Sequence, residues 1–419
     1  MFKNKGNIFG YIELNNICFL FKNSPNDDTR KTSDDPEKIL PFSFSFNDET
    51  IIDKDKYILI FYDDIKEIIK RRVCLLYIGL EIFLKDNRSY MFNFFSKNAV
   101  NKFIDEIKKY TQYKNNNEEL QKKDDDKKAI NNNNNSNPPS NKIIPNINKS
   151  EKYIKIIEDP INEFKKLQLK LKNKKIYLSN FNYLLLINKY SSRTYNDYNQ
   201  YLVFPLLYMD IENKKERDLS KALCLHKENY QKALEKIKSN YEYFNYHFNQ
   251  HYSTSGFILF YLVRSIPFTY QHILFQSNKF DVPNRLFSSF NNLYYFFEIT
   301  DDNRELIPEF YHSFEFLVNL NYNDFGVIKT SEENYHLNNV DTYCKYSFPE
   351  YIIKSRNNLE KFDLSPWIDN IFGVKQTSSS EDEPNLFPLE SYEENCKLED
   401  ILKEDKPINQ KVEEIKRKS

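Results

Sequence analysis

The stretch from His247 to Arg264 reads HFNQHYSTSGFILFYLVR and carries the clearest local signal in the chain. Ser253 and Thr254 stand just before Phe257–Val263, a run in which every residue is apolar. A Ser/Thr pair in this place is the usual N-cap of a helix, because its hydroxyl accepts a hydrogen bond from a free N–H of the first turn. We therefore predict a buried central helix over Phe257–Val263, capped by Ser253 or Thr254.

The sequence from about Phe164 onward is mainly helical in pattern, with long irregular stretches between the periodic segments. His226–Tyr241 and Arg285–Glu298 each place apolar residues on one face at helical spacing. We therefore predict a mainly α-helical domain with irregular connections. The apolar positions are Tyr230, Ala233, Leu234, Ile237 and Tyr241 in the first segment and Leu286, Phe290, Leu293 and Phe297 in the second.

The first hundred residues predict strands instead. Ile8–Leu14 and Ile17–Phe21 are separated by Asn15-Asn16, a two-residue hairpin signal. Lys22–Thr50 is polar and rich in Asp, Ser and Pro, which indicates mostly loop. The further strand-like runs are Tyr57–Tyr62, Val73–Ile78, Leu80–Leu84 and Tyr90–Phe95.

A helix is predicted over Lys97–Lys109, where Val100, Phe103, Ile104 and Ile107 fall at helical spacing. Strands followed by one amphipathic helix indicate a small β-barrel closed by a C-terminal helix, which is the element order of a pleckstrin-homology (PH) fold. The whole chain is therefore expected to be α+β, with this PH-like barrel followed by the helical domain.

A polar segment separates the two predicted domains. It contains three consecutive aspartates, Asp124 to Asp126, an Asn run over Asn131–Asn135, and Pro138-Pro139. So few of these residues can be buried that we predict a disordered linker. The predicted division is a PH-like domain over 1–110, a linker over 111–163, the helical domain over 164–395 and a charged tail over 396–419.

Composition excludes several classes of protein. Lys+Arg number 60 and Asp+Glu 61, so no overall field attracts nucleic acid. The 5 cysteines are scattered without a CxxC pair, which argues against a zinc ribbon and fits a reducing compartment. The longest apolar run is far shorter than the roughly 18–20 residues that cross a bilayer. With 1 tryptophan, a WD40 propeller is excluded within the chain.

Three residues offer an alternative, catalytic or metal-binding interpretation. His247 and His251 stand four residues apart, with His272 further along, and Ser253 is close to His251 in sequence. The HxxxH spacing lacks the Glu of zinc proteases, and no glycine precedes the serine as in a nucleophile elbow. We expect these side chains to satisfy buried polar groups, with a degenerate hydrolase or metal site using His247, His251 and Ser253 as the alternative.

An acidic cluster, Asp301, Asp302, Glu305 and Glu309, surrounds Arg304. The spacing of a calcium-binding EF-hand loop is missing, so the cluster does not predict a metal site. We expect a solvated turn before Leu306, with an acidic docking surface as the alternative. No cofactor is expected, because 6 glycines cannot support a phosphate-binding loop.

Lys70, Arg71 and Arg72 form the basic run of the PH-like region. Phosphoinositide-binding PH domains usually carry basic residues on the first two strands and their loop, yet Ile8–Phe21 contains no Lys or Arg. Without cations there, little offsets the desolvation of a phosphate. We therefore predict no phosphoinositide binding in the usual PH mode, and a surface or interdomain stripe at Lys70–Arg72.

The stretch from His247 to Arg264 resembles the signature of the BEACH-domain family, a His-Tyr-Ser block that leads through Gly256 and Phe257 into an apolar helix. Other blocks resemble the family in the same order. They are Leu178–Leu184, Arg193–Pro205, Arg217–Lys221, Pro267–Phe287, Glu305–Asn319, Asp324–Gly326, Trp367–Gln376 and Asn385–Phe387.

The region Asp63–Phe83 resembles the PH-like domain that precedes BEACH in neurobeachin-type proteins. The chain also departs from the family pattern. Ala222 stands where the family has a proline, Asn249 replaces a glycine, and the segment around Asp341–Cys344 differs. The WD40 propeller that commonly follows BEACH is missing, which puts in doubt any partner recruited by a propeller.

The resemblance implies a non-catalytic scaffold for vesicle and membrane traffic, of the lysosome-related organelle or autophagy type. It implies a helical BEACH fold with an irregular extended core, and a groove between the PH-like and BEACH domains that binds trafficking proteins. The implied location is cytoplasmic, partly on endomembranes through indirect contacts. Candidate groove residues are Arg71, Arg72, Lys279 and Arg285, and the signature core is His251, Tyr252, Ser253, Gly256, Phe280 and Asp281.

Overall fold

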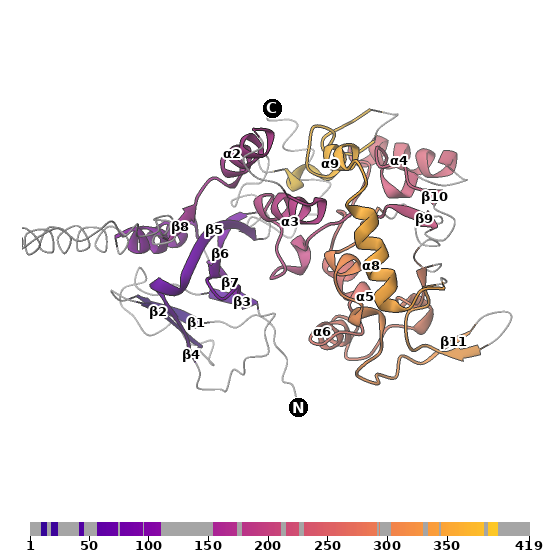
Figure 1. Cartoon of the computed structure of the whole chain (residues 1–419), viewed down its shortest axis with the longest axis horizontal. Coiled ribbons are helices and arrows are strands. Elements are labelled where there is room, and N and C mark those ends of the chain that lie inside the picture. The colour runs from indigo at the N-terminus through magenta and orange to yellow at the C-terminus, as the bar shows by residue number, and fades with distance from the viewer. Residues whose placement is uncertain are drawn as a thin grey trace, which may run out of the picture. The chain divides into compact units, whose positions relative to one another are not determined.

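The computed structural model shows a mixed α+β protein. Its described residues fall into two compact units, a sheet unit within Lys5–Asp159 and a helical unit within Pro160–Ser419 (Figure 1). The described residues are 10–14, 18–23, 42–45, 57–73, 76–94, 96–109, 154–173, 178–210, 215–225, 230–290, 293, 303–329, 334–342, 345–380 and 384–392.

The sheet unit contains one 8-stranded sheet in the order β4-β2-β1-β3-β7-β6-β5-β8. Every neighbouring pair is antiparallel except β5 and β8, which are parallel. No pairing joins β4 to β8 among the described residues, so the ladder is open and the predicted barrel closure stays a prediction. The strands are β1 Gly10–Leu14, β2 Cys18–Asn23, β3 Phe42–Ser45, β4 Tyr57–Phe61, β5 Ile65–Val73, β6 Leu76–Leu84, β7 Ser89–Phe94 and β8 Lys155–Ile157.

The predicted helix after the strands is confirmed over residues 97–109. Its four apolar positions are buried in one cluster with residues of β5, β6 and β7. Phe103 meets Phe94 edge-on, with ring centroids 5.7 Å apart. The helix therefore covers one face of the sheet, as its apolar stripe requires.

The predicted hairpin of the first two strands is confirmed, because β1 and β2 pair antiparallel with Ile12 opposite Phe21. Leu14 faces Phe19, so the connection is longer than the two residues predicted, and residues 15–17 lie outside the described residues. The predicted strands Tyr57–Tyr62 and Tyr90–Phe95 are confirmed as β4 and β7 to within a residue, but the boundaries between them were wrong. Ile65–Val73 is a strand that the sequence analysis missed. The run predicted over Val73–Ile78 begins at the end of β5, and its residues 76–78 form one strand, β6, together with Leu80–Leu84. Five charged residues between Ile65 and Val73 obscure the alternation of β5.

Two further predictions about loops need correction. The segment Lys22–Thr50 contains β3, which pairs with β7. The C-terminal part of the predicted linker over 111–163 contains β8, and it also contains the start of α2. Ile157 is 1% exposed, and Glu158 accepts hydrogen bonds from Lys70 at 3.3 Å and Lys108 at 2.5 Å. Residues 111–153 lie outside the described residues.

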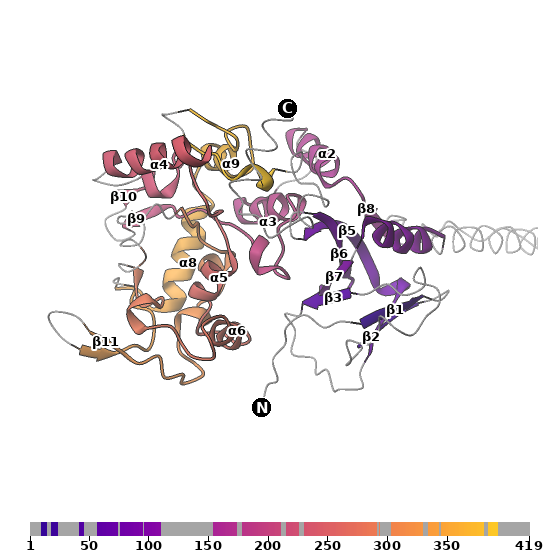
Figure 2. The same cartoon turned by 180° about the vertical axis from the view of Figure 1, so that it is seen from behind.

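The helical unit consists of helices joined by long segments without regular structure. In both views α4 and α9 lie at one end of this unit, and α6 and β11 lie at the other (Figures 1 and 2). Its α-helices are α2 Pro160–Lys172, α3 Asn180–Tyr190, α4 Tyr230–Phe244, α5 Ser255–Tyr261, α6 Phe268–Phe275, α8 Phe348–Leu359 and α9 Ser365–Ile371. Short 3-10 turns include η4 Tyr198–Gln200, η5 Leu223–Leu225, η6 Pro283–Arg285, η7 Pro308–Tyr311, η8 Glu315–Leu317 and η9 Leu389–Ser391. Two small antiparallel strand pairs are β9 Tyr208–Asp210 with β10 Lys215–Glu216, and β11 Val327–Lys329 with β12 Asn334–His336.

The predicted central helix is confirmed as α5. The hydroxyl of Thr254 accepts a hydrogen bond from the N–H of Phe257 at 3.4 Å, as an N-cap does. All residues from Phe257 to Tyr261 are buried. The predicted helix at Arg285–Glu298 was wrong for its first residues, because residues 286–289 are not helical and run on from η6.

The core of the helical unit contains extended chain as well as helices. Residues 201–207 and 303–307 are buried and without helical structure, and the isolated antiparallel bridge between Phe204 and Leu306 joins them. Phe310 packs its ring against those of Tyr261 and Phe316, at 5.2 and 4.8 Å. Within the described ranges, no helix combines the length and the apolar character that crossing a bilayer requires.

Truncation of this aromatic centre tests the packing. We expect Phe310→Ala to lower the free energy of unfolding of the helical unit by about 3–5 kcal/mol, because it leaves a cavity among rings. Trp367, which is buried in this unit, reports its unfolding by urea through tryptophan fluorescence. The control Tyr243→Ala removes a ring that is 78% exposed and should change stability by less than about 0.5 kcal/mol. Equal effects of the two variants would contradict the packing.

Candidate functional site

A buried ion pair links Arg217 to Glu305 in the helical unit. Nη1 of Arg217 donates to Oε2 of Glu305 at 2.7 Å, and Nη2 donates to Oε1 at 2.6 Å. Both side chains are 1% exposed. The planar guanidinium matches the two carboxylate oxygens, so each charge neutralises the other away from water. The pair is an internal support, and neither charge is free for a partner.

The same pair bonds the backbone of nearby irregular segments. Nη2 of Arg217 donates to the carbonyl of Lys221 at 3.1 Å, and Oε2 of Glu305 accepts from the N–H of Leu206 at 3.4 Å. The N–H of Glu305 donates to the carbonyl of Tyr252 at 3.0 Å. These bonds tie the signature segment to two segments that are far from it in the sequence.

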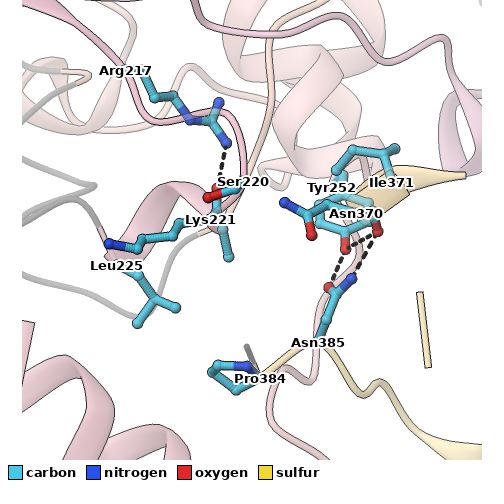
Figure 3. Close-up of a pocket in the computed structure, with 10 residues that line it drawn as sticks. Arg217, Ser220, Lys221, Leu225, Tyr252, Asn370, Ile371, Pro384 and Asn385 are labelled. Atoms are coloured by element: carbon cyan, nitrogen blue, oxygen red, sulfur yellow. Dashed lines mark hydrogen bonds between the residues drawn. The ribbon is translucent and has the colours of Figure 1, made fainter. Parts of the chain in front are cut away.

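A pocket opens beside this ion pair, where four stretches of the chain meet (Figure 3). It encloses about 360 Å³ of empty space, part of which is open solvent. One wall is polar, and the other carries apolar side chains together with Lys221. The lining residues are Arg217, Ser220, Lys221, Ala222, Leu225, Tyr252, Asn370, Ile371, Pro384 and Asn385.

Amide and phenol groups hold the polar wall in place. The hydroxyl of Tyr252 donates to Oδ1 of Asn385, and Nδ2 of Asn385 donates to the carbonyl of Asn370 at 2.7 Å (Figure 3). Nδ2 of Asn370 donates to the carbonyl of Leu219 at 3.2 Å. Burial raises the pKa of Tyr252, so this phenol stays protonated and acts as a hydrogen-bond donor. The wall supports the fold, since Tyr252, Asn385 and Asn370 each have a hydrogen-bond partner inside it.

The residues of the catalytic alternative do not converge. Ser253 donates its hydroxyl to the carbonyl of Tyr201 at 3.1 Å and accepts from Arg193 at 2.7 Å. Nε2 of His251 bonds Oγ of Ser391 at 2.8 Å, and Nδ1 of His247 accepts from the N–H of Leu386 at 3.1 Å. The two histidines therefore both contact the segment 386–391, whereas Ser253 is bonded to a different part of the fold, at Tyr201 and Arg193.

No group of three or more His, Cys, Asp or Glu side chains in the described ranges is arranged to hold a metal ion. His272, the third histidine considered, accepts from the N–H of Asp281 at 3.4 Å. Burial lowers the pKa of both His247 and His272, which favours the neutral rings that accept these bonds.

The interpretation of the acidic cluster as a solvated turn was wrong for the residues that the structure describes, and so was the docking surface. Glu305 is buried by its pairing with Arg217. The guanidinium of Arg304 lies over the ring of Phe257, 4.3 Å from its centroid, and the residue is 8% exposed. Asp301 and Asp302 lie outside the described residues.

Glu309, the last member of that cluster, has its carboxyl group in the core. Oε1 accepts from the hydroxyl of Tyr201 at 2.7 Å, and Oε2 is buried without a hydrogen-bond partner among the described residues. Burial raises the pKa of Glu309 from 4.5 to about 7. A carboxyl group in this setting is protonated below neutral pH and is charged only at a cost.

The structure separates the four candidate groove residues by exposure. Arg71 is 1% exposed, and its Nε donates to Glu81 at 2.7 Å, so its charge is used inside the sheet unit. Arg72 is partly buried and lies over the ring of Tyr77. Lys279 and Arg285 are exposed on the helical unit. Arg71 therefore does not suit a partner contact, whereas the last two residues do.

The signature core residues behave mainly as supports. Tyr252 and Ser253 are buried, and His251, Gly256, Phe280 and Asp281 are partly buried. The carboxylate of Asp281 accepts from the N–H of Val282 at 2.7 Å and so bonds the backbone.

Asparagine side chains satisfy much of the irregular backbone in this unit. Asn180 donates to the carbonyls of Leu359 and Phe362 at 2.8 and 3.0 Å. Asn319 bonds both the N–H and the carbonyl of Asn323. Sequence reasoning missed Asn188, which bonds the N–H and the carbonyl of Val203 at 2.9 and 3.0 Å, because its partner is in another segment.

Two protein-family models match the chain. The model described as Beige/BEACH domain matches residues 171–418, which is more than half of the chain. The model described as PH domain associated with Beige/BEACH matches residues 15–108. The first match covers the Arg217–Glu305 pair and the pocket, and the second covers most of the sheet unit.

The chain is similar to parts of longer proteins. It is 33% identical over 231 residues to the human Lysosomal-trafficking regulator (48% of this chain, 6% of that protein). It is 32% identical over 285 residues to BEACH domain-containing protein lvsE of Dictyostelium discoideum (62% and 13%). It is 33% identical over 243 residues to Protein SPIRRIG of Arabidopsis thaliana (54% and 7%). The chain thus spans a small fraction of the length of these relatives.

Breaking the ion pair from one side should destabilise the helical unit. We expect Arg217→Met or Glu305→Leu alone to lower the free energy of unfolding by about 3–5 kcal/mol, because each leaves a buried charge without its partner. The double variant should lose less than either single variant, since no charge is left. Urea unfolding followed by Trp367 fluorescence measures all three. Additive losses in the double variant would show that the two residues do not act as a pair.

The carboxyl group of Glu309 should make stability depend on pH. The folded state keeps a proton that the unfolded chain releases near pH 4.5, so the free energy of unfolding should fall as pH rises from 4.5 to about 7 and then level off. The loss should reach up to about 3 kcal/mol. Glu309→Gln should remove this fall. Urea titrations of both proteins from pH 4 to 8 measure it, and parallel pH profiles would contradict the assignment.

Proposed function

The chain belongs to the Beige/BEACH domain family, and from this premise we propose that it is a non-catalytic scaffold that binds proteins of vesicle and membrane traffic. The observation that carries the proposal is the family match over residues 171–418, together with a relative named Lysosomal-trafficking regulator. The whole relative is far longer, so its role enters here as a proposal for this chain.

The internal contacts support a scaffold rather than an enzyme. The side chains that a hydrolase would need, Ser253 and His251, are each bonded to a different supporting group. The ion pair between Arg217 and Glu305 is sealed from water. Groups that are already paired in this way stabilise one shape, and a fixed shape is what a docking platform requires.

The proposed partners are trafficking proteins of the lysosome-related organelle or autophagy type, and the proposed location is cytoplasmic with indirect attachment to endomembranes. We further propose that the PH-like region does not hold phosphoinositides in the usual way. Support comes from β1, which has no cation, and β2, where Lys22 is the sole cation. The binding groove between the two domains stays a prediction from the family resemblance.

Proximity labelling in cells tests the proposal. A biotin ligase fused to the full chain should label vesicle coat, tethering and lysosomal proteins. A fusion that lacks residues 15–108 should label fewer of them, because the PH-like domain would contribute to the binding platform. The free ligase is the control for random labelling. If the full chain labelled the same proteins as the free ligase, the trafficking role would be refuted.

A further inference from the structure

We propose that a surface beside α6 binds an acidic peptide segment with a large apolar side chain, contributed by a partner protein. The proposal rests on the scaffold function above and names the chemistry of one of its partners. The surface, called the α6–η6 patch, combines three exposed apolar side chains with cations on the same loop. Its residues are Leu274, Phe275, Val282, Lys279 and Arg285.

The backbone of this loop brings the apolar side chains together. Helix α6 ends at Phe275, and the next turn contains Ser277 and Asn278 in the left-handed region, with φ of 58° and 66°. The N–H of Asp281 then donates to Nε2 of His272 in the last turn of α6, at 3.4 Å. Phe275 comes three residues after His272, and Val282 directly follows Asp281. The bond between His272 and Asp281 therefore keeps the backbone of Phe275 and Val282 in one neighbourhood.

The loop is anchored, so its exposed groups are held in position. Phe280 packs edge-on against Phe325, with centroids 4.9 Å apart, and contacts the buried cluster around Val263 and Leu286. Phe275 and Val282 are nevertheless 60% and 53% exposed. Large apolar side chains that are exposed on an anchored loop are typical of a protein-binding surface.

The charges near the patch favour an acidic partner. Lys279 is exposed, the side chain of Arg285 is 65% exposed, and Nδ2 of Asn284 donates to the carbonyl of Lys329, a third exposed cation. The side chain of Asp281 is 14% exposed, and it already accepts from Arg285. Cations therefore dominate the part of the surface that a partner would meet.

Besides Asp281, a second carboxylate among the described residues belongs to the same neighbourhood. Asp324 is exposed and accepts from the N–H of Gly326 at 2.9 Å. Within the part of the chain that the structure describes, the three exposed cations still outnumber these two carboxylates. The chain as a whole has a formal net charge of -1, so the positive patch is a local feature and not a reflection of overall composition.

A peptide fits the patch better than a lipid surface does. Recognition of anionic lipids usually involves clusters of roughly 4–8 Lys or Arg side chains. The patch offers two cations, with Lys329 nearby as a third, and three apolar side chains, which matches a short segment with a few carboxylates around one anchor. The patch is also separate from the pocket lined by Asn370 and Ile371 of α9. Helices α4 and α9 lie at one end of the helical unit, whereas α6 and β11 lie at the other (Figures 1 and 2).

Selection from a random peptide library displayed on phage tests this proposal with the full chain as bait. We expect the enriched peptides to combine an aromatic or large aliphatic residue with two or more Asp or Glu. Synthetic copies should bind Lys279→Glu/Arg285→Glu and Phe275→Ser/Val282→Ser at least about tenfold more weakly than the unmodified chain. Trp367 fluorescence should be unchanged, because all four positions are exposed.

Matched control variants separate the patch from general charge and apolar effects. Lys170→Glu/Lys172→Glu reverses two exposed cations on α2, and Tyr243→Ser removes an exposed ring on α4. Both should bind the selected peptides about as well as the unmodified chain. Enriched peptides without acidic residues, or equal binding by patch and control variants, would overturn the proposal.

A vesicle-binding measurement distinguishes a lipid-binding surface from a peptide-binding surface. If vesicles of phosphatidylcholine and phosphatidylserine bound the chain through Lys279 and Arg285 while no acidic peptide was enriched, the surface would be a lipid site and the peptide proposal would be wrong. The selection does not depend on which cellular proteins are labelled. A successful selection with failed proximity labelling would refute the trafficking role alone, and the reverse result would refute the patch alone.

Discussion

The helical unit depends on one constraint, which is that buried extended chain must find hydrogen-bond partners without a regular sheet. Residues 201–207 and 303–307 are buried in this way, and the bridge between Phe204 and Leu306 is isolated. A buried backbone group without a partner costs about 1–3 kcal/mol. The Arg217–Glu305 pair meets part of this need, because it neutralises two charges and also bonds the backbone of Leu206 and Lys221.

Asparagine side chains meet much of the remaining need. An amide carries both donors and an acceptor, so it can replace both halves of a strand neighbour. Asn188 does so for Val203, and Asn385 joins Tyr252, Asn370 and Lys375. Such a network specifies one arrangement of the segments, since a shifted segment would leave buried polar groups unpaired.

The polar side chains that hold the fold together are different residues from those that are exposed on the surface. Polar side chains of the family blocks that could bind or react, among them Arg217 and Ser253, are bonded internally. Lys279, Arg285 and Phe275 are exposed instead and share one anchored loop, where we propose that a partner binds. If the chain acts as the scaffold proposed above, this division would let it change partners through a few surface residues without losing its fold.

Local sequence signals determined the hairpin of β1 and β2, the helix over residues 97–109 and α5 with its Thr254 cap, because each depends on neighbours within a few residues. The family signature was likewise readable from the order of its blocks. The burial of Glu305 was decided by tertiary structure, since its partner Arg217 is 88 residues away and nothing near Glu305 predicts it. The strand β8 and the exposure of Phe275 also follow from packing, because hydrophobic spacing predicts a face but not what will cover it.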